Sequence, residues 1–197
     1  TFIDEGCTIV PSWLAEGYGA DDSNLIIDPE ESFGIGDHPT TQLCARWLLG
    51  EDLKGVRILD AGCGTGVLSV IAARCGANVV AVDIAENALG ATGRNAARNT
   101  LTLEKICRWE DLGSDEDFDV IVANILAPVL IDLAPLLTSL LRPGGRIVMA
   151  GVRIEPVSRV IEVYSSLTIA SRGEFDGWAL IELQAPRTTE RTPSANV

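Results

Sequence analysis

The sequence has few of the residues from which metal sites and disulfide frameworks are built. It contains a single histidine, His38, and no Cys-x-x-Cys pair. The cysteines are odd in number and scattered along the chain, which does not fit a disulfide framework. We therefore expect no metal site, and we predict reduced, mostly buried thiols in a cytoplasmic protein. The cysteines are Cys7, Cys44, Cys63, Cys75 and Cys107.

Long apolar runs are also absent. No stretch approaches the ~20 uninterrupted apolar residues that a membrane-spanning helix needs. Polar residues and prolines interrupt the most apolar region, residues 121–141. Residues 1–31 are acidic and lack the basic, apolar and small-residue order of a signal peptide. We expect neither secretion nor a membrane partner. The chain begins with threonine, which is consistent with a longer parent protein.

Basic residues are scarce. Fifteen Lys and Arg stand against 28 Asp and Glu, so the formal net charge is −13. Such a surface repels phosphate backbones and attracts a basic partner, for instance a lysine-rich protein segment. We therefore expect no nucleic-acid partner. The alternative explanation of the acidic composition is that it only keeps the protein soluble. With 197 residues, 47% of them hydrophobic, the chain can form one α/β domain with a full core.

From Val56 onward, short apolar runs rich in β-branched residues alternate with helical patterns. This alternation is typical of a parallel sheet with helices on both faces. The last two strands follow each other without a helix, so they should form an antiparallel hairpin, as in a methyltransferase sheet. The expected fold is α/β, a Rossmann-like, doubly wound, mostly parallel sheet with an antiparallel C-terminal hairpin. Strands are predicted at 56–60, 78–84, 105–109, 118–125, 146–150, 167–174 and 178–184, helices at 41–49, 67–75, 86–99, 126–141 and 155–165, and a tight turn at 143–145.

The same pattern predicts how the chain is divided. Residues 1–32 are expected to be a linker-like N-terminal segment, and residues 33–185 the α/β domain. Residues 186–197, which are rich in Thr, Pro, Ser and Asn, are expected to be a flexible tail.

A glycine-rich loop follows the first predicted strand of the α/β domain. It reads Asp60-Ala-Gly62-Cys-Gly64-Thr-Gly66 and stands between a strand and a helix, where open α/β sheets bind ligands. Dinucleotide-binding loops need a small residue where this chain has Val67, so the nicotinamide alternative is disfavoured. Asp60, at a buried strand end, needs a partner, and the amino group of a methionine moiety would be one. The loop therefore predicts an adenosine-containing ligand that contacts Gly62 and Gly64.

Three further strand ends carry candidate ligand residues. Asp83 ends the second strand and can accept hydrogen bonds from both ribose hydroxyls; its alternative role is to cap the helix that follows. Trp109 or Glu110 could flank an adenine, although surface placement fits equally well. Asn124 can orient an amine that awaits methylation, or else cap the next helix. Residues 125–127 (ILA) offer no aromatic platform for a nucleobase, which argues against a DNA or RNA base as acceptor.

The loop at residues 33–41, FGIGDHPTT, is the most specific motif. Together with the motifs VPSW (10–13), LIIDP (25–29), the glycine loop and NILA (124–127), it resembles the PrmA family over about residues 8–183. That family methylates the ribosomal large-subunit stalk-base protein. The resemblance implies a class I methyltransferase domain that uses S-adenosylmethionine. It places Thr41, Gly62, Asp83 and Asn124 at the cofactor, and it implies that His38 and Thr40 form a lid.

The resemblance implies methyl transfer to a protein amino group, on lysine or at an N-terminus. The acceptor is then a basic protein, such as a ribosomal protein, and Asn124 is the catalytic candidate. The family also has a separate N-terminal substrate-binding domain, for which residues 1–32 are too short. Two alternatives stay open: a stand-alone N-methyltransferase for a small amine or peptide, and a cofactor-binding module without turnover.

Overall fold

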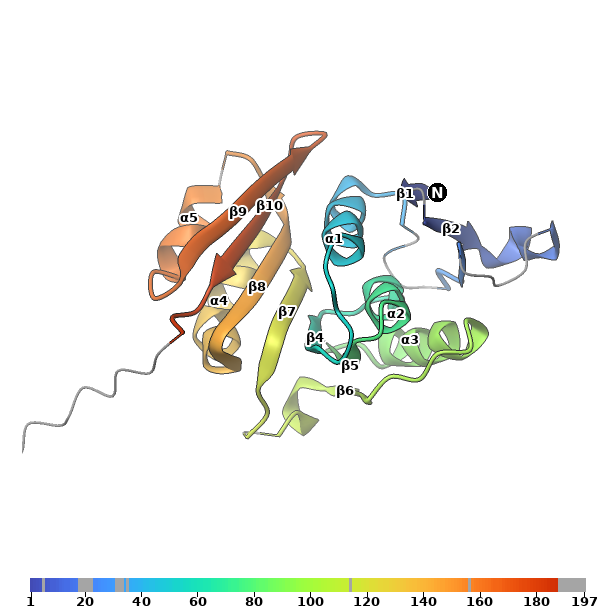
Figure 1. Cartoon of the computed structure of the whole chain (residues 1–197), viewed down its shortest axis with the longest axis horizontal. Coiled ribbons are helices and arrows are strands. Elements are labelled where there is room, and N and C mark those ends of the chain that lie inside the picture. Colours follow the sequence, from blue (N-terminus) through green and yellow to red (C-terminus); the bar gives the residue numbers. More distant parts are fainter. Residues whose placement is uncertain are drawn as a thin grey trace, which may run out of the picture.

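The computed structural model describes residues 1–4, 6–17, 23–30, 34, 36–113, 115–155 and 157–187. A seven-stranded sheet forms the centre of the molecule, with helices on both of its faces (Figure 1). The strand order is β6-β5-β4-β7-β8-β10-β9, and only the pairs that involve β10 are antiparallel. The predicted doubly wound sheet with an antiparallel C-terminal hairpin is confirmed. The strands are β4 (Arg57–Ala61), β5 (Asn78–Asp83), β6 (Lys105–Arg108), β7 (Phe118–Asn124), β8 (Leu141–Arg153), β9 (Thr168–Phe175) and β10 (Trp178–Gln184).

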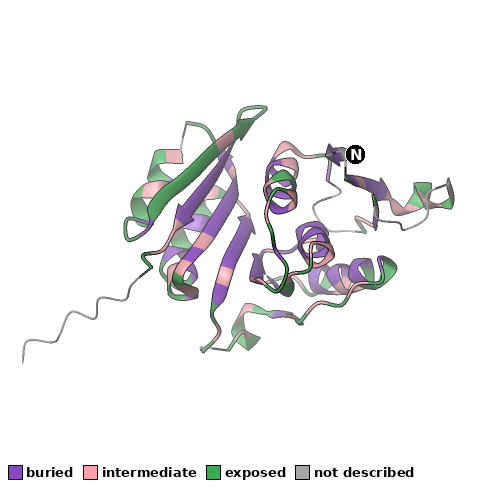
Figure 2. Ribbon diagram, viewed as in Figure 1, coloured by how far each residue is buried: buried purple, intermediate pink, exposed green. Residues whose placement is uncertain are grey.

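The helices divide between the two faces as right-handed crossovers require. Alternate strand residues face opposite sides, so Ile58 packs in one core and Leu59 in the other. The first core lies under α1 (Pro39–Leu49), α2 (Val67–Arg74) and α3 (Glu86–Arg98). The second lies under α4 (Ala127–Ser139) and α5 (Val157–Val163). The central strands are buried on both faces, whereas the edge strand β9 is largely exposed (Figure 2).

The structure changes two expectations about local elements. Residues 143–145 do not form a turn that precedes a strand, because β8 runs unbroken from Leu141 to Arg153. The extra residues are absorbed as an irregularity against β7, between the pairs Phe118↔Leu141 and Val120↔Arg146. At its other end β8 passes the predicted limit at Ala150, because β10 continues to pair with it as far as Arg153.

The segment predicted as linker-like contains regular structure in its described residues. The strands β1 (Phe2–Asp4), β2 (Cys7–Pro11) and β3 (Asn24–Ile27) form a second, three-stranded sheet, and a 3-10 helix, η1 (Ser12–Gly17), follows β2. Ile9 and Ile27 are fully buried and belong to the same core as α1 and α2. Their burial explains why these residues are ordered strands. The domain division itself stays a prediction, and residues 188–197 of the predicted tail lie outside the described residues.

Within the described ranges, no helix is long and apolar enough to cross a membrane.

Candidate functional site

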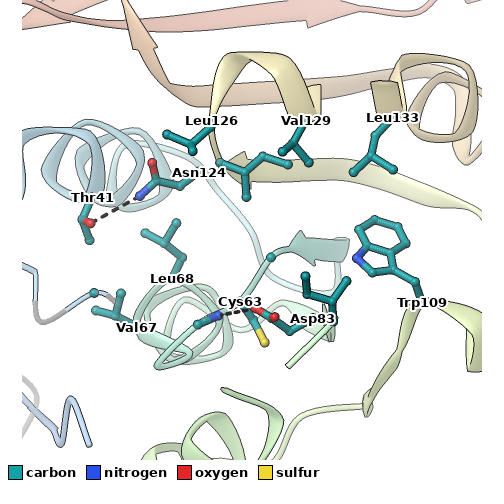
Figure 3. Close-up of a pocket in the computed structure, with 15 residues that line it drawn as sticks. Thr41, Cys63, Val67, Leu68, Asp83, Trp109, Asn124, Leu126, Val129 and Leu133 are labelled. Carbon is teal, nitrogen blue, oxygen red and sulfur yellow. Dashed lines mark hydrogen bonds between the residues drawn. The ribbon is translucent and has the colours of Figure 1, made fainter. Parts of the chain in front are cut away.

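A cavity of about 570 Å³ opens at the carboxyl ends of β4, β5 and β7 (Figure 3). The strand order reverses between β4 and β7, and a doubly wound sheet binds its ligand at such a switch point. Five of the six predicted site residues line this cavity, although they come from four separate parts of the chain. They are Thr41, Gly62, Gly64, Asp83 and Asn124.

The glycine loop forms the floor of the cavity. Gly62, Gly64 and Gly66 all have positive φ angles, and the Gly62 amide donates to the Val82 carbonyl at 2.8 Å. A Cβ at Gly62 would lie 2.5 Å from the Ile125 side chain, and one at Gly66 would lie 2.7 Å from Thr92. A loop of this shape tolerates no side chain at these two positions. The helix α2 then begins at Val67, whose amide donates to the Thr65 hydroxyl at 3.4 Å, and its first residues, Val67 and Leu68, line the cavity.

Asp83 contributes a carboxylate to the cavity wall. Its Oδ2 accepts a hydrogen bond from the Gly64 amide at 3.0 Å, and its Oδ1 accepts one from the Ala85 amide at 3.0 Å. The second bond does not cap α3, because the N-cap of that helix is Ala85, two residues after Asp83, and it has no side-chain cap. Asp83 therefore holds the glycine loop and the turn before α3 while it lines the cavity. Each oxygen keeps acceptor capacity for a ligand.

Asp60 lies apart from the other predicted residues. It is buried in the first core and does not line the cavity. Its Oδ2 accepts a hydrogen bond from the Ser69 hydroxyl at 2.6 Å, so the partner that this carboxyl needs is supplied by α2. Burial raises the pKa of Asp60 to about 6, although the bonds from Ser69 act in the opposite direction. In this structure Asp60 connects β4 to α2 behind the glycine loop.

Asn124 and Thr41 meet across the cavity from elements that are 83 residues apart. The Nδ2 group of Asn124 donates to the Thr41 hydroxyl at 3.3 Å (Figure 3). The alternative capping role is not seen, because the N-cap of α4 is Leu126 and no side chain caps this helix. The main chain beyond Asn124 is held closely: Gly151 of β8 has a φ of +85°, and a Cβ there would collide with the Ile125 carbonyl.

The loop that precedes α1 lies partly outside the described residues, which exclude Phe33 and Ile35. Gly34 lines the cavity, and its carbonyl accepts a hydrogen bond from the Thr65 hydroxyl. His38 is the N-cap of α1, with its Nδ1 atom 2.7 Å from the Thr40 hydroxyl. The His38 ring also meets Trp178 edge-on, at 5.0 Å between ring centroids. Neither His38 nor Thr40 lines the cavity, so their predicted lid role stays a prediction.

An apolar wall completes the cavity and was largely missed from the sequence. Ile84 and Trp109 stand on one side, at the ends of β5 and β6. Leu126, Val129 and Leu133 stand on the other, along the first turns of α4 (Figure 3). These three residues are spaced by three and four positions, so they share one face of the helix. That spacing is the feature of the sequence from which this wall could have been predicted. Trp109 was an open alternative with Glu110; Glu110 does not line the cavity, is exposed and pairs with Arg108 at 3.0 Å.

The described part of the chain holds no cluster of three His, Cys, Asp or Glu side chains that could bind a metal ion. All five cysteines are free thiols.

A seven-stranded sheet of this order, with a glycine loop and an acidic strand end around a cavity at its switch point, defines the class I methyltransferase fold. Residues 2–186 match the family described as Ribosomal protein L11 methyltransferase (PrmA), and the chain belongs to this family. The predicted resemblance is confirmed.

The comparisons with individual proteins agree with this assignment. The chain is 45% identical over 177 residues to a ribosomal protein L11 methyltransferase of Pseudomonas savastanoi pv. phaseolicola, an alignment that covers 88% of this chain and 60% of the relative. It therefore spans about three fifths of that relative's length. The crystal structure of a ribosomal protein L11 methylase from Lactobacillus delbrueckii subsp. bulgaricus superposes with a TM-score of 0.83 at 29% identity, over 94% of this chain and 97% of that one.

A more distant fold relative is the N-methyltransferase NodS of Bradyrhizobium japonicum in complex with S-adenosyl-L-homocysteine. Its TM-score is 0.60 at 20% identity, over 76% of this chain and 89% of that one.

Proposed function

We propose that this chain is the catalytic domain of an S-adenosylmethionine-dependent N-methyltransferase that modifies an amino group of a basic protein, of the ribosomal-protein type. The observation that carries the proposal is the cavity at the switch point of a PrmA-family domain, where Asp83, the glycine loop, Thr41 and Asn124 converge. The five free thiols support the further proposal that the protein works in the reducing cytoplasm.

The residues around the cavity fit S-adenosylmethionine in their chemistry. Asp83 would accept hydrogen bonds from the ribose hydroxyls. Ile84 and Trp109 would contact the adenine, because both give the cavity an apolar wall at the ends of β5 and β6. The main chain at Gly62 and Gly64 would approach the ligand closely, as a loop without side chains permits. Thr41 and Asn124 would lie toward the reacting end. Asp60, being outside the cavity, would act on the ligand only through the loop that it supports.

When bound, S-adenosylmethionine supplies an electrophilic methyl group on a sulfonium centre. The protein's task is to hold an amine in line with that group, a positioning effect of the kind that carries much of the rate in such reactions. Asn124 suits this task because its bond to Thr41 uses the Nδ2 group and leaves Oδ1 to accept a hydrogen bond from the amine. Asn124 is not a base, so the amine proton must leave to water or to an acidic neighbour.

The acceptor is proposed to be a lysine or an N-terminal amine of a ribosomal protein. The relatives' name supports it, as does the net charge of −13, which attracts a basic segment. The chain spans about three fifths of the relative's length. The proposal therefore assigns methyl transfer to this chain and leaves open which residues capture the substrate.

The experiment is incubation with methyl-labelled cofactor and, separately, purified ribosomal protein L11 or a metabolite extract. Label in the protein, located on an amine by mass spectrometry, is the expected result. Label that enters only small molecules would replace the protein acceptor with a small amine. Turnover of neither kind, with no cofactor binding by calorimetry at millimolar concentration, would overturn the whole proposal.

The Asn124→Ala variant tests the role of the amide. We expect kcat to fall about 100-fold, a loss typical of a misplaced reactant, while the Kd for cofactor changes much less. Equal turnover in parent and variant would show that Asn124 has no catalytic part.

A further inference from the structure

The helix α3 carries a buried polar stripe on the face that packs toward the glycine loop. Thr92, Asn95 and Asn99 are spaced by three and four residues, so they share one helix face. Thr92 and Asn95 are fully buried, and Asn99 is 5% exposed. Buried amides are costly unless each donor and acceptor is paired. The partners of this stripe therefore show what it is for.

The two asparagines bind the main chain in closely matched ways. Asn99 accepts from the Ile26 amide and donates to the Ile26 carbonyl, both at 2.8 Å. Asn95 does the same with Asp28, again at 2.8 Å in both directions. Each carboxamide thus bonds both the amide and the carbonyl of one main-chain residue at the end of β3, as a neighbouring strand would do. Together they fasten the N-terminal segment to α3.

The remaining hydrogen bonds distinguish the two residues, and Asn95 Oδ1 also accepts one from the Arg98 guanidinium at 2.8 Å. Asn99 Nδ2 also donates to the Asn95 carbonyl, within its own helix, at 2.8 Å. Asn95 Nδ2 donates instead to the carbonyl of Thr65, inside the glycine loop, at 2.9 Å. Thr65 is fully buried, and its hydroxyl donates to the carbonyl of Gly34, which lines the cavity. Asn95 is therefore in direct contact with both the glycine loop and the segment that leads toward the loop before α1.

Thr92 adds a contact in the same direction. Its hydroxyl lies 3.2 Å from the Gly64 carbonyl, and its Cγ2 atom occupies the space beside Gly66. This face of α3 thus contacts three consecutive residues of the glycine loop, Gly64, Thr65 and Gly66. No residue of the stripe lines the cavity itself.

We infer that Asn95 is a positioning residue, whose carboxamide fixes the Thr65 carbonyl to the Asp28 main chain and so keeps the glycine loop in the form that binds cofactor. This role rests on the proposed function. The stripe does not line the cavity; it sets the shape of a loop that contains three glycines.

The test compares Asn95→Ala and Asn95→Asp with Asn99→Ala, all in the full chain. Asn95→Ala removes the link to Thr65, and Asn95→Asp keeps the size and the acceptor but has no N–H for the two carbonyls. Asn99→Ala removes an equivalent pair of bonds to β3 and leaves the glycine loop untouched. Cofactor Kd by calorimetry, KM and kcat, and urea unfolding are measured for each.

We expect both Asn95 variants to raise the cofactor Kd and KM by about three- to thirty-fold, and Asn99→Ala to leave them within twofold. The urea unfolding midpoint should fall for all three variants. A general loss of stability therefore cannot explain a change in Kd that is confined to the Asn95 variants. Equal Kd changes in the Asn95 and Asn99 variants, or none in either, would overturn the inference.

Amide hydrogen exchange gives a readout that does not depend on cofactor. In the free protein, Asn95→Ala should speed exchange in peptides that cover residues 62–68, and Asn99→Ala should not. If the parent binds no cofactor, the proposed function fails, and exchange alone decides the role of Asn95. Unchanged exchange at residues 62–68 in a folded Asn95 variant would then refute it.

Discussion

The Asp83→Asn variant tests the cofactor site most directly. The change keeps the size of the side chain but removes its charge and turns one oxygen into an NH₂ group. In the structure both oxygens accept main-chain amides, from Gly64 and Ala85, each at 3.0 Å. An amide in this place must therefore turn a donor toward one of these donors, which breaks one of the two bonds.

The expected magnitudes follow from these contacts. A hydrogen bond to a charged group contributes about 1.5–3 kcal/mol, and Asp83 is half-buried. The loss of one main-chain bond should therefore lower the free energy of unfolding by about 1–2 kcal/mol. Two ribose hydroxyl bonds would be weakened as well, and a discounted loss of about 2–3 kcal/mol corresponds to a Kd roughly 30- to 150-fold higher.

The assay is titration calorimetry with S-adenosylmethionine and with S-adenosylhomocysteine, together with urea unfolding of the same samples. Asp52→Asn, at an exposed residue that does not line the cavity, is the control, and we expect no change in its affinity. A folded Asp83→Asn protein that binds cofactor within threefold of the parent would refute the reasoning. It would leave Asp83 with only its structural bonds to the glycine loop and α3.

The other predictions concern Asp60 and Gly151. The folded pKa of Asp60 is about 6, above its unfolded value of 3.8, so the parent should lose stability relative to Asp60→Asn as pH rises from about 3 to about 7, by up to about 3 kcal/mol. Urea unfolding at several pH values measures this, and a pH-independent difference would contradict it. Gly151→Ala should cost more than the ~1–2 kcal/mol of a left-handed alanine, because it collides with the Ile125 carbonyl, whereas Gly55→Ala meets no atom within 4 Å. Similar losses in both variants would contradict the role of Gly151 in holding residues 124–126.

The sequence by itself determined the order of the elements from α1 onward, the class of fold and the position of the glycine loop. These features depend on local patterns: apolar runs for strands such as β7, helical spacing for α2, and glycines where φ is positive at residues 62, 64 and 66. Such signals are contained in a short window of chain, so they can be read without knowing its partners. The family motifs added the cofactor expectation in the same way.

The tertiary structure alone decided which side chains meet. Asp60 binds Ser69 and lies behind the loop, whereas Asn124 reaches Thr41 across 83 residues. The three-stranded N-terminal sheet forms because its apolar residues enter the core under α1 and α2. Asn95 looks like an ordinary polar residue on a helix until β3 and the glycine loop are placed against it. Partner choice of this kind depends on packing between distant segments, and no local pattern in the chain encodes it.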